Sequence, residues 1–310
     1  MSLKHHLEYA FLRGCIGLIR LLPRNGAYAT LEKMALLAHR GFGWRKESTV
    51  RRIAKVCPER SPEEQMRIRE EAVRNLGRNL TELIRADKAE EVEISGERET
   101  FAAFRAAREK GRGILLVIVH SGNWDLAGLR TVREGFPMCF IAREQKNPLT
   151  YELLVRVREQ NGGSVVDRDD PRLIRKLLSF LADNGIVAIL IDIRARQAGD
   201  AFRYLGQEAW LANGLGLLAA KSGAEVVPVF LGREGRDRHI WKPLPARRLE
   251  PGSTGKTERN ALLQSCLDEL GAEVQTHPES YFWFNKRWVL EAFQSENGSG
   301  ISGTRPDQTL

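Results

Sequence analysis

Residues 114–125 read ILLVIVHSGNWD, an apolar run that ends in a short polar turn. The run from Ile114 to Val119 is partly β-branched and uninterrupted, which is typical of a strand buried on both faces of a sheet. His120 follows the run directly, so the imidazole is predicted to lie at the carboxyl end of a strand. Asp125 stands five residues later, past a Ser-Gly-Asn turn and at the start of the next predicted helix. Ligands of α/β proteins bind at this end of parallel strands.

The rest of the chain from about residue 111 alternates between strand-like and helix-like segments. Short apolar runs predict further strands at residues 138–142, 164–166, 186–191 and 226–231. Helices are predicted at residues 126–133, 149–160, 171–183, 214–222 and 257–276. This alternation predicts an α/β fold with a mostly parallel central sheet flanked by helices, because parallel strands need crossover connections.

Three regions are expected along the chain. Residues 1–87 read as a helical N-terminal region, and the sequence Ser61-Pro62-Glu63-Glu64 is a typical helix start. Residues 88–294 form the α/β core. Residues 295–310 are polar and glycine-rich, which predicts a disordered tail.

The N-terminal segment, residues 7–22, is apolar but carries Glu8, Arg13 and Arg20. Those charges argue against a membrane-spanning helix and a signal peptide. Its apolar residues recur at helical spacing and predict an amphipathic helix: Leu7, Phe11, Cys15, Leu18 and Leu22. Such a helix either packs on its own domain or lies in a membrane interface as a membrane-associating segment.

Composition narrows the class of protein. Of 310 residues, 42% are hydrophobic and 28% charged, as in folded soluble domains and unlike disordered or multi-span membrane proteins. The formal net charge of +8 suits an anionic partner, such as nucleic acid, an anionic membrane surface or an acidic carrier protein. The cysteines are widely separated, which argues against a zinc site or a disulfide framework and fits a reducing compartment: Cys15, Cys57, Cys139 and Cys266.

His120 and Asp125 are the candidate catalytic pair. The end of a strand and the start of a helix can bring an imidazole and a carboxylate together, so that Asp125 fixes the tautomer of His120 while His120 takes a proton. The amino end of that helix also offers free N–H groups to an anion, and Gly122 allows close approach of a substrate. The structural alternative is a surface histidine followed by a helix-capping aspartate.

The segment His120-Ser121-Gly122-Asn123-Trp124-Asp125 resembles the H-x-G-N-W-[E/D] signature of the late lipid A biosynthesis acyltransferases, within the wider H-x4-D acyltransferases. Further resemblances follow in order along the chain: Ile141-Ala142-Arg143 with Asn147-Pro148, residues 167–170, Asp192 after a strand, residues 223–228 and the aromatic segment 278–288. Departures are Ile193 after Asp192, and residues 210–213 in place of a threonine-rich stretch. No F-P-E-G-T block stands between residues 191 and 206, which disfavours glycerol phosphate as the acceptor.

This resemblance implies transfer of a fatty acyl group from acyl carrier protein or acyl-CoA to a hydroxyl of a membrane glycolipid, a lipid A precursor. It implies His120 as general base, Asp125 as its orienting partner, and neither a cofactor nor a metal. It also implies a place on the cytoplasmic face of a bacterial inner membrane.

Three further residues are expected to bind substrate, each with a structural alternative. Arg143 would hold a phosphate, because a guanidinium makes bidentate phosphate contacts, or would pair with Glu144 at the surface. Asp192 would position Arg143 or a substrate hydroxyl, or would cap a strand end. Asn123 would donate to an oxyanion or form the turn. The aromatic and basic residues at 283–288 fit either a membrane interface or a buried core.

Two other functions remain open at this stage. A thioester or lipid hydrolase could use the same pair to activate water. A basic module that binds membranes or nucleic acid is the non-enzymatic alternative, although no nucleic-acid motif supports it, so no nucleic-acid partner is expected.

Overall fold

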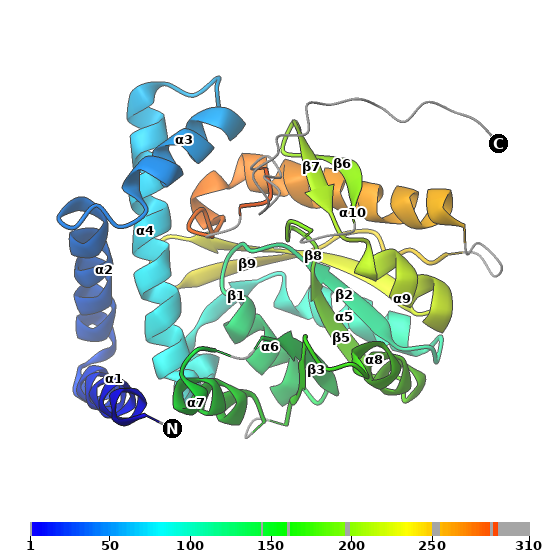
Figure 1. Cartoon of the computed structure of the whole chain (residues 1–310), viewed down its shortest axis with the longest axis horizontal. Coiled ribbons are helices and arrows are strands. Elements are labelled where there is room, and N and C mark those ends of the chain that lie inside the picture. Colours follow the sequence, from blue (N-terminus) through cyan, green and yellow to red (C-terminus); the bar gives the residue numbers. More distant parts are fainter. Residues whose placement is uncertain are drawn as a thin grey trace.

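In the computed structural model, which describes residues 2–143, 145–159, 162–195, 199–249, 255–285 and 288–290, a seven-stranded sheet runs through the middle of the molecule (Figure 1). Its strand order is β1-β9-β8-β2-β5-β3-β4. The strands are β1 (Glu93–Ser95), β2 (Ile114–Ile118), β3 (Met138–Ala142), β4 (Ser164–Asp167), β5 (Ile186–Leu190), β8 (Glu225–Glu234) and β9 (Arg238–Pro243).

The sheet is mostly parallel, as predicted. β8, β2, β5, β3 and β4 pair in parallel, while β9 runs antiparallel to β8 and carries β1 beside it. In the pairing of β2 with β5, Ile118 lies opposite Leu190. The residues that follow these two strands therefore emerge next to each other at the same edge, although about 70 residues separate them in the chain.

Helices cover both faces of the sheet. On one face α5 (Glu97–Arg108) and α6 (Trp124–Arg133) pack against Leu116 and Ile118 of β2. On the other face Leu115 and Val117 pack with α8 (Leu173–Ala182), α9 (Gly214–Ser222) and α10 (Lys256–Thr276). The strand is buried on both sides because alternate side chains of a strand point to opposite faces. Between β3 and β4 lies α7 (Pro148–Glu159).

Four helices precede the sheet: α1 (Leu3–Leu21), α2 (Arg24–Arg40), α3 (Lys46–Val56) and α4 (Pro62–Ile84). The predicted helix start is present in α4, because Ser61 accepts from the Glu64 backbone and the Glu64 side chain accepts from the Ser61 backbone. A short 3-10 helix, η1 (Ala86–Glu91), then leads into β1.

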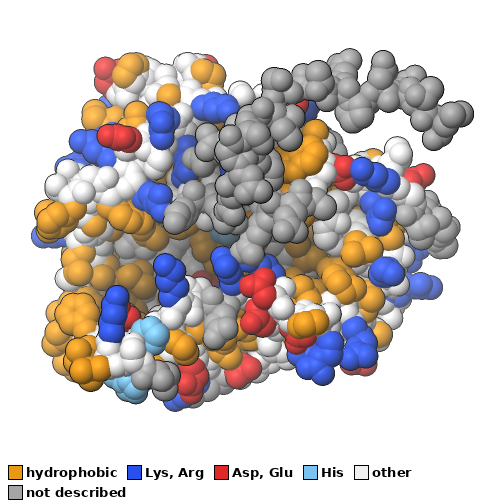
Figure 2. Space-filling view, viewed as in Figure 1, with side chains coloured by type: hydrophobic (Ala, Val, Ile, Leu, Met, Phe, Trp, Pro, Cys, Tyr) orange, Lys and Arg blue, Asp and Glu red, His pale blue; other side chains and the backbone are white. Residues whose placement is uncertain are grey.

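The helix α1 keeps its apolar face exposed. Ile19 is buried against the helix that follows, whereas the exposed side chains fall on one side of α1: Leu3, Leu7, Phe11, Leu18 and Leu21. Hydrophobic side chains are visible along the edge of the molecule where the first helices lie (Figure 2). None of the described helices combines the length and the apolar character needed to cross a bilayer.

Two further features of the second half of the chain lie outside the seven-stranded sheet. The antiparallel hairpin of β6 (Asp200–Tyr204) and β7 (Gln207–Leu211), which was not predicted from the sequence, contacts α10. After η2 (Pro278–Ser280), the aromatic segment is buried rather than displayed at the surface, with Trp283 fully buried and its carbonyl accepting from Arg52 at 2.6 Å. Lys286, Arg287 and the predicted tail at 295–310 lie outside the described residues.

Candidate active site

The turn after β2 carries His120 and is held on both sides by backbone contacts. Gly122 has a φ of +58°, and a Cβ there would lie 2.8 Å from the Leu231 carbonyl, so only glycine fits without strain. Its N–H donates to the Ser280 carbonyl at 2.9 Å. Asn123 ends the turn and caps α6, because its side-chain oxygen accepts from the Leu126 N–H at 3.1 Å.

His120 is paired with Asp192, which follows β5. The imidazole Nδ1 lies 2.8 Å from Asp192 Oδ1. The other carboxylate oxygen, Oδ2, accepts from the backbone N–H of His120 at 3.0 Å and from the Tyr281 hydroxyl at 2.9 Å. Because an ionised carboxylate can only accept, Nδ1 carries the proton, and Nε2 is the nitrogen left to act as a base.

The Asp192 carboxylate is stabilised in its charged form. Its side chain is almost fully buried, and burial by itself raises the pKa of a carboxyl group. The charge and the hydrogen bonds of His120, with the hydrogen bond from Tyr281, outweigh burial and hold the pKa of Asp192 below its ordinary value. The site therefore keeps a negative charge next to the imidazole.

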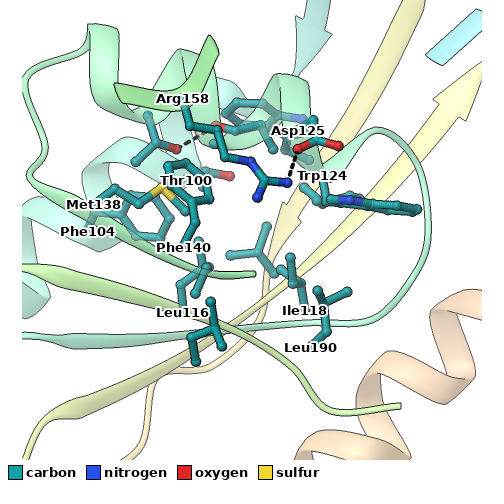
Figure 3. Close-up of a pocket in the computed structure, with 18 residues that line it drawn as sticks. Thr100, Phe104, Leu116, Ile118, Trp124, Asp125, Met138, Phe140, Arg158 and Leu190 are labelled. Atoms are coloured by element: carbon teal, nitrogen blue, oxygen red, sulfur yellow. Dashed lines mark hydrogen bonds and ion pairs between the residues drawn. The ribbon is translucent and has the colours of Figure 1, made fainter. Parts of the chain in front are cut away.

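The prediction of a hydrogen bond between Asp125 and His120 was wrong. Asp125 Oδ1 instead accepts from Arg158 Nη2 at 2.7 Å, an ion pair between α6 and α7 that Figure 3 displays. The reason is that the carboxyl ends of β2 and β5 are neighbours in the sheet, so Asp192 reaches the imidazole while Asp125, in the first turn of α6, faces α7.

Asn123 is committed to the fold. Besides capping α6, it donates a hydrogen bond from Nδ2 to Glu82 Oε2 at 2.7 Å. Glu82 also accepts hydrogen bonds from Arg233, His239 and Tyr28. In this arrangement Asn123 performs the turn-forming role that was one of its two predicted roles.

Arg143 lies outside this cluster. Its side chain is 57% exposed, and its Nε lies 3.7 Å from Asp169 Oδ2. Asp192 does not position Arg143, since its described partners are His120 and Tyr281. Glu144, the predicted surface partner of Arg143, lies outside the described residues.

An apolar cavity lies on the side of Trp124, whose ring contacts the imidazole. Trp124 packs edge-on against His120, with ring centroids 5.3 Å apart, and also lines the cavity. Figure 3 shows the Asp125–Arg158 pair along one side of the space and aliphatic side chains of the sheet along another. The remaining labelled lining residues are Thr100, Phe104, Leu116, Ile118, Met138, Phe140 and Leu190.

This lining suits a hydrocarbon chain. Apart from the Asp125–Arg158 pair and two threonines, the cavity walls are aliphatic or aromatic, and such walls favour burial of apolar surface. Among the described residues, no group of three or more histidine, cysteine, aspartate or glutamate side chains could hold a metal ion.

Three contributors to the site were missed from the sequence. Arg158 had no local signal, because nothing in the sequence distinguishes it from the neighbouring Arg156 of the same helix. Tyr281 and Phe282 belong to the aromatic segment noted in the sequence, but nothing in that segment indicated that it would meet the His120 turn. Phe282 donates its N–H to the His120 carbonyl at 2.7 Å.

The chain was compared with known proteins. It is 26% identical over 188 residues to a phosphatidylinositol mannoside acyltransferase of Mycolicibacterium smegmatis, a match that covers 60% of each chain. It is 24% identical over 194 residues to the phosphatidylinositol mannoside acyltransferase of Mycobacterium tuberculosis strain H37Rv, covering 61% of this chain and 59% of the relative. The chain thus spans about 60% of the length of the curated relatives it matches.

The family comparison extends over nearly the whole chain. The model of the bacterial lipid A biosynthesis acyltransferases matches residues 2–289, which include the N-terminal helices, the His120 turn and the Tyr281 segment. A match over this length shows that the chain belongs to the bacterial lipid A biosynthesis acyltransferase family.

Proposed function

We propose that this protein transfers a fatty acyl group from an acyl thioester to a hydroxyl group of a membrane glycolipid. The observation that carries the proposal is the His120–Asp192 pair beside an apolar cavity. A base next to a space for a hydrocarbon chain is what acyl transfer to a hydroxyl requires.

In the proposed reaction, Nε2 of His120 takes the proton of the acceptor hydroxyl as its oxygen attacks the thioester carbonyl. The carbon–oxygen bond forms, and the carbonyl oxygen becomes an oxyanion. When the oxyanion collapses, the carbon–sulfur bond breaks and the leaving thiolate takes the proton from His120. Asp192 stabilises the imidazolium that exists between these two proton transfers, because its buried charge lies 2.8 Å from Nδ1.

The cavity would hold the acyl chain of the donor. Trp124 both lines the cavity and packs against His120, so we place the carbonyl end of the acyl chain at the Trp124 end of the cavity, toward the imidazole. Burial of each methylene contributes about 0.8 kcal/mol, so the chain would supply much of the binding energy for the donor.

The acceptor is proposed from the family and the relatives. The curated relatives are phosphatidylinositol mannoside acyltransferases, and the family is named for lipid A biosynthesis. Both names describe acylation of a glycolipid, which we take as the acceptor class, with a lipid A precursor as the first candidate. Acyl carrier protein and acyl-CoA are the two candidate donors.

Substitution of His120 by Ala tests the chemistry. The variant is expected to lose acyl transfer by a factor of about 10²–10⁴, because the positioned base is gone, while donor binding stays close to that of the parent. The assay supplies a long-chain acyl thioester with a glycolipid acceptor, and mass spectrometry follows the acyl increment on the lipid. Near-normal transfer by the variant would refute His120 as the base.

The same assay separates transfer from hydrolysis. A hydrolase that uses the same pair to activate water would release free fatty acid as its sole product in the presence of the acceptor. Ester formation on the glycolipid supports transfer.

We also propose that the protein acts at the cytoplasmic face of a bacterial inner membrane, with α1 lying in the interface. The exposed apolar side of α1 and the net charge of +8 support this placement. The parent protein is expected to sediment with anionic vesicles. A variant in which Phe11 and Leu18 are both replaced by Glu is expected to stay in the supernatant. The same binding by this variant as by the parent would contradict the placement.

A further inference from the structure

Tyr281 touches the buried side of the catalytic pair. Its hydroxyl donates to Asp192 Oδ2 at 2.9 Å, and its side chain is itself buried. With the backbone N–H of His120 on the same oxygen and Nδ1 on the other, the Asp192 carboxylate accepts three hydrogen bonds. Removing one donor would leave a buried carboxylate oxygen with a single partner.

The backbone around Tyr281 is joined to the His120 turn. Ser121 and Tyr281 form an antiparallel bridge, and Phe282 donates its N–H to the His120 carbonyl at 2.7 Å. Gly122 donates to the Ser280 carbonyl at 2.9 Å. The tyrosine therefore keeps a fixed place relative to the imidazole, and its hydroxyl reaches Asp192 from a rigid support.

We propose that Tyr281 is a positioning residue for the acyl transfer reaction: its hydroxyl orients the Asp192 carboxylate toward His120 and limits how strongly that carboxylate attracts the imidazolium proton. This inference rests on the proposed role of His120 as the general base.

The Tyr281 hydroxyl changes the distribution of negative charge on the Asp192 carboxylate. A donor on Oδ2 stabilises the ionised carboxylate and reduces its basicity. Without the hydroxyl, the carboxylate attracts a proton on Nδ1 more strongly, and the protonated imidazole becomes more stable. His120 would then remain protonated to a higher pH and be available as a base only above it.

Other titratable and charged groups lie near His120 and Asp192. Tyr204 of β6 is a buried phenol close to Asp192: burial raises its pKa, and the nearby negative charge raises it further. Asp125 of α6 is neutralised by its ion pair with Arg158 of α7. Among the described residues at this site, Asp192 is the carboxylate that contacts the imidazole.

Replacement of Tyr281 by Phe removes only the hydroxyl. The ascending limb of the kcat/KM profile is expected to move up by about half to one pH unit, so activity on that limb falls about threefold to tenfold. The KM value for the thioester should stay unchanged, because Tyr281 does not line the cavity proposed for the acyl chain.

A second measurement does not depend on turnover. In protein labelled with ¹³C-histidine, the titration midpoint of the His120 ring is expected to rise in Tyr281→Phe, with the His120 resonance identified by its loss in His120→Gln. If this midpoint rises in Tyr281→Phe but His120→Ala is fully active, Tyr281 does act on His120 through Asp192, and His120 is not the general base. If the midpoint is unchanged in Tyr281→Phe and His120→Ala is inactive, His120 remains the proposed base and the positioning role of Tyr281 is rejected.

Tyr28→Phe is the matched control. Tyr28 is also a buried phenol that donates to a buried carboxylate, Glu82, at 2.9 Å, but it does not touch Asp192. The two variants should lose similar stability, and only Tyr281→Phe should shift the pH profile and the His120 titration. Equal behaviour of the two variants in both measurements would overturn the positioning role.

Discussion

Asp192 is a buried charge whose stability depends on what surrounds it. Moving a carboxylate out of water is costly unless it is paired and hydrogen-bonded, and Asp192 meets both conditions through His120 and Tyr281. The same contacts fix the tautomer of His120 and leave Nε2 for chemistry. At the scale of single residues, the hydrogen bonds that permit the burial of Asp192 thus also orient the imidazole of His120.

Replacing Asp192 by Asn should lower kcat by about 10²–10⁴ without a comparable rise in KM, because an amide can stabilise the wrong imidazole tautomer and carries no charge. Steady-state kinetics at several pH values would measure this. Asp125→Asn is the informative comparison, since Asp125 pairs with Arg158 instead. Full activity of Asp192→Asn beside an inactive Asp125→Asn would show that Asp125 is the functional partner.

At the scale of elements, the cavity depends on the alternation of side chains along the central strands. Leu116 and Ile118 of β2 point into the face covered by α5 and α6, and Ala188 of β5 lies opposite Leu116. The small side chain of Ala188 leaves room between the sheet and the helices, and it lines the cavity. If the cavity holds the acyl chain as proposed, side-chain volume at this position of the sheet limits the length of chain that it accepts.

A larger side chain at that position should shift the preference of the enzyme toward shorter acyl chains. Ala188→Leu adds about three carbons to the cavity wall, which removes space that a long chain would fill. Relative kcat/KM values for a series of acyl thioesters would measure the shift. Ala106→Leu, on the exposed side of α5, adds the same volume outside the cavity and should leave the preference unchanged. An equal loss for every chain length in Ala188→Leu would contradict this use of the cavity.

At the scale of the whole molecule, one buried ionic cluster joins the N-terminal helices to the sheet. The carboxylate of Glu82 in α4 accepts hydrogen bonds from Arg233 of β8 at 2.7 Å, His239 of β9 at 3.1 Å and Tyr28 of α2 at 2.9 Å. Through Asn123, the same carboxylate also holds the turn that carries His120. The helical region and the site therefore share one set of buried charges.

This cluster makes stability depend on pH. Burial and the charge of Arg233 lower the pKa of His239, so His239 stays neutral in the folded state at pH values where the unfolded chain binds a proton. Burial alone would raise the pKa of Glu82, but Arg233 and His239 lower it, so Glu82 likewise resists protonation when folded. For both groups the stabilisation is present above the unfolded-state pKa and is lost as pH falls below it.

The free energy of unfolding is therefore expected to fall as pH drops from about 7.5 to 5.5, with a slope of up to about 1.4 kcal/mol per pH unit for the proton taken up by His239. Urea unfolding at these pH values measures the slope. His239→Gln keeps a donor toward Glu82 but cannot titrate, so its slope should be flatter than that of the parent. Identical slopes for the variant and the parent would assign the pH dependence to other groups.

The sequence by itself determined the five strands that pair in parallel (β2, β3, β4, β5 and β8), the type of sheet and the place of His120. A continuous apolar run such as residues 114–119 and the capping sequence at Ser61 act through neighbours a few residues away, so they can be interpreted locally. The edge formed by β9 and β1 and the hairpin of β6 and β7 were missed, because short strands with mixed polarity give a weak local signal.

Only the tertiary structure decided which groups meet at the site. β2 lies beside β5 although β3 and β4 come between them in the chain, and this strand order gives His120 the carboxylate of Asp192 instead of the nearer-in-sequence Asp125. The Tyr281 hydroxyl reaches the same carboxylate from more than 150 residues beyond His120. Helical periodicity and strand alternation describe one element at a time, whereas a hydrogen bond between elements depends on their order and packing in space.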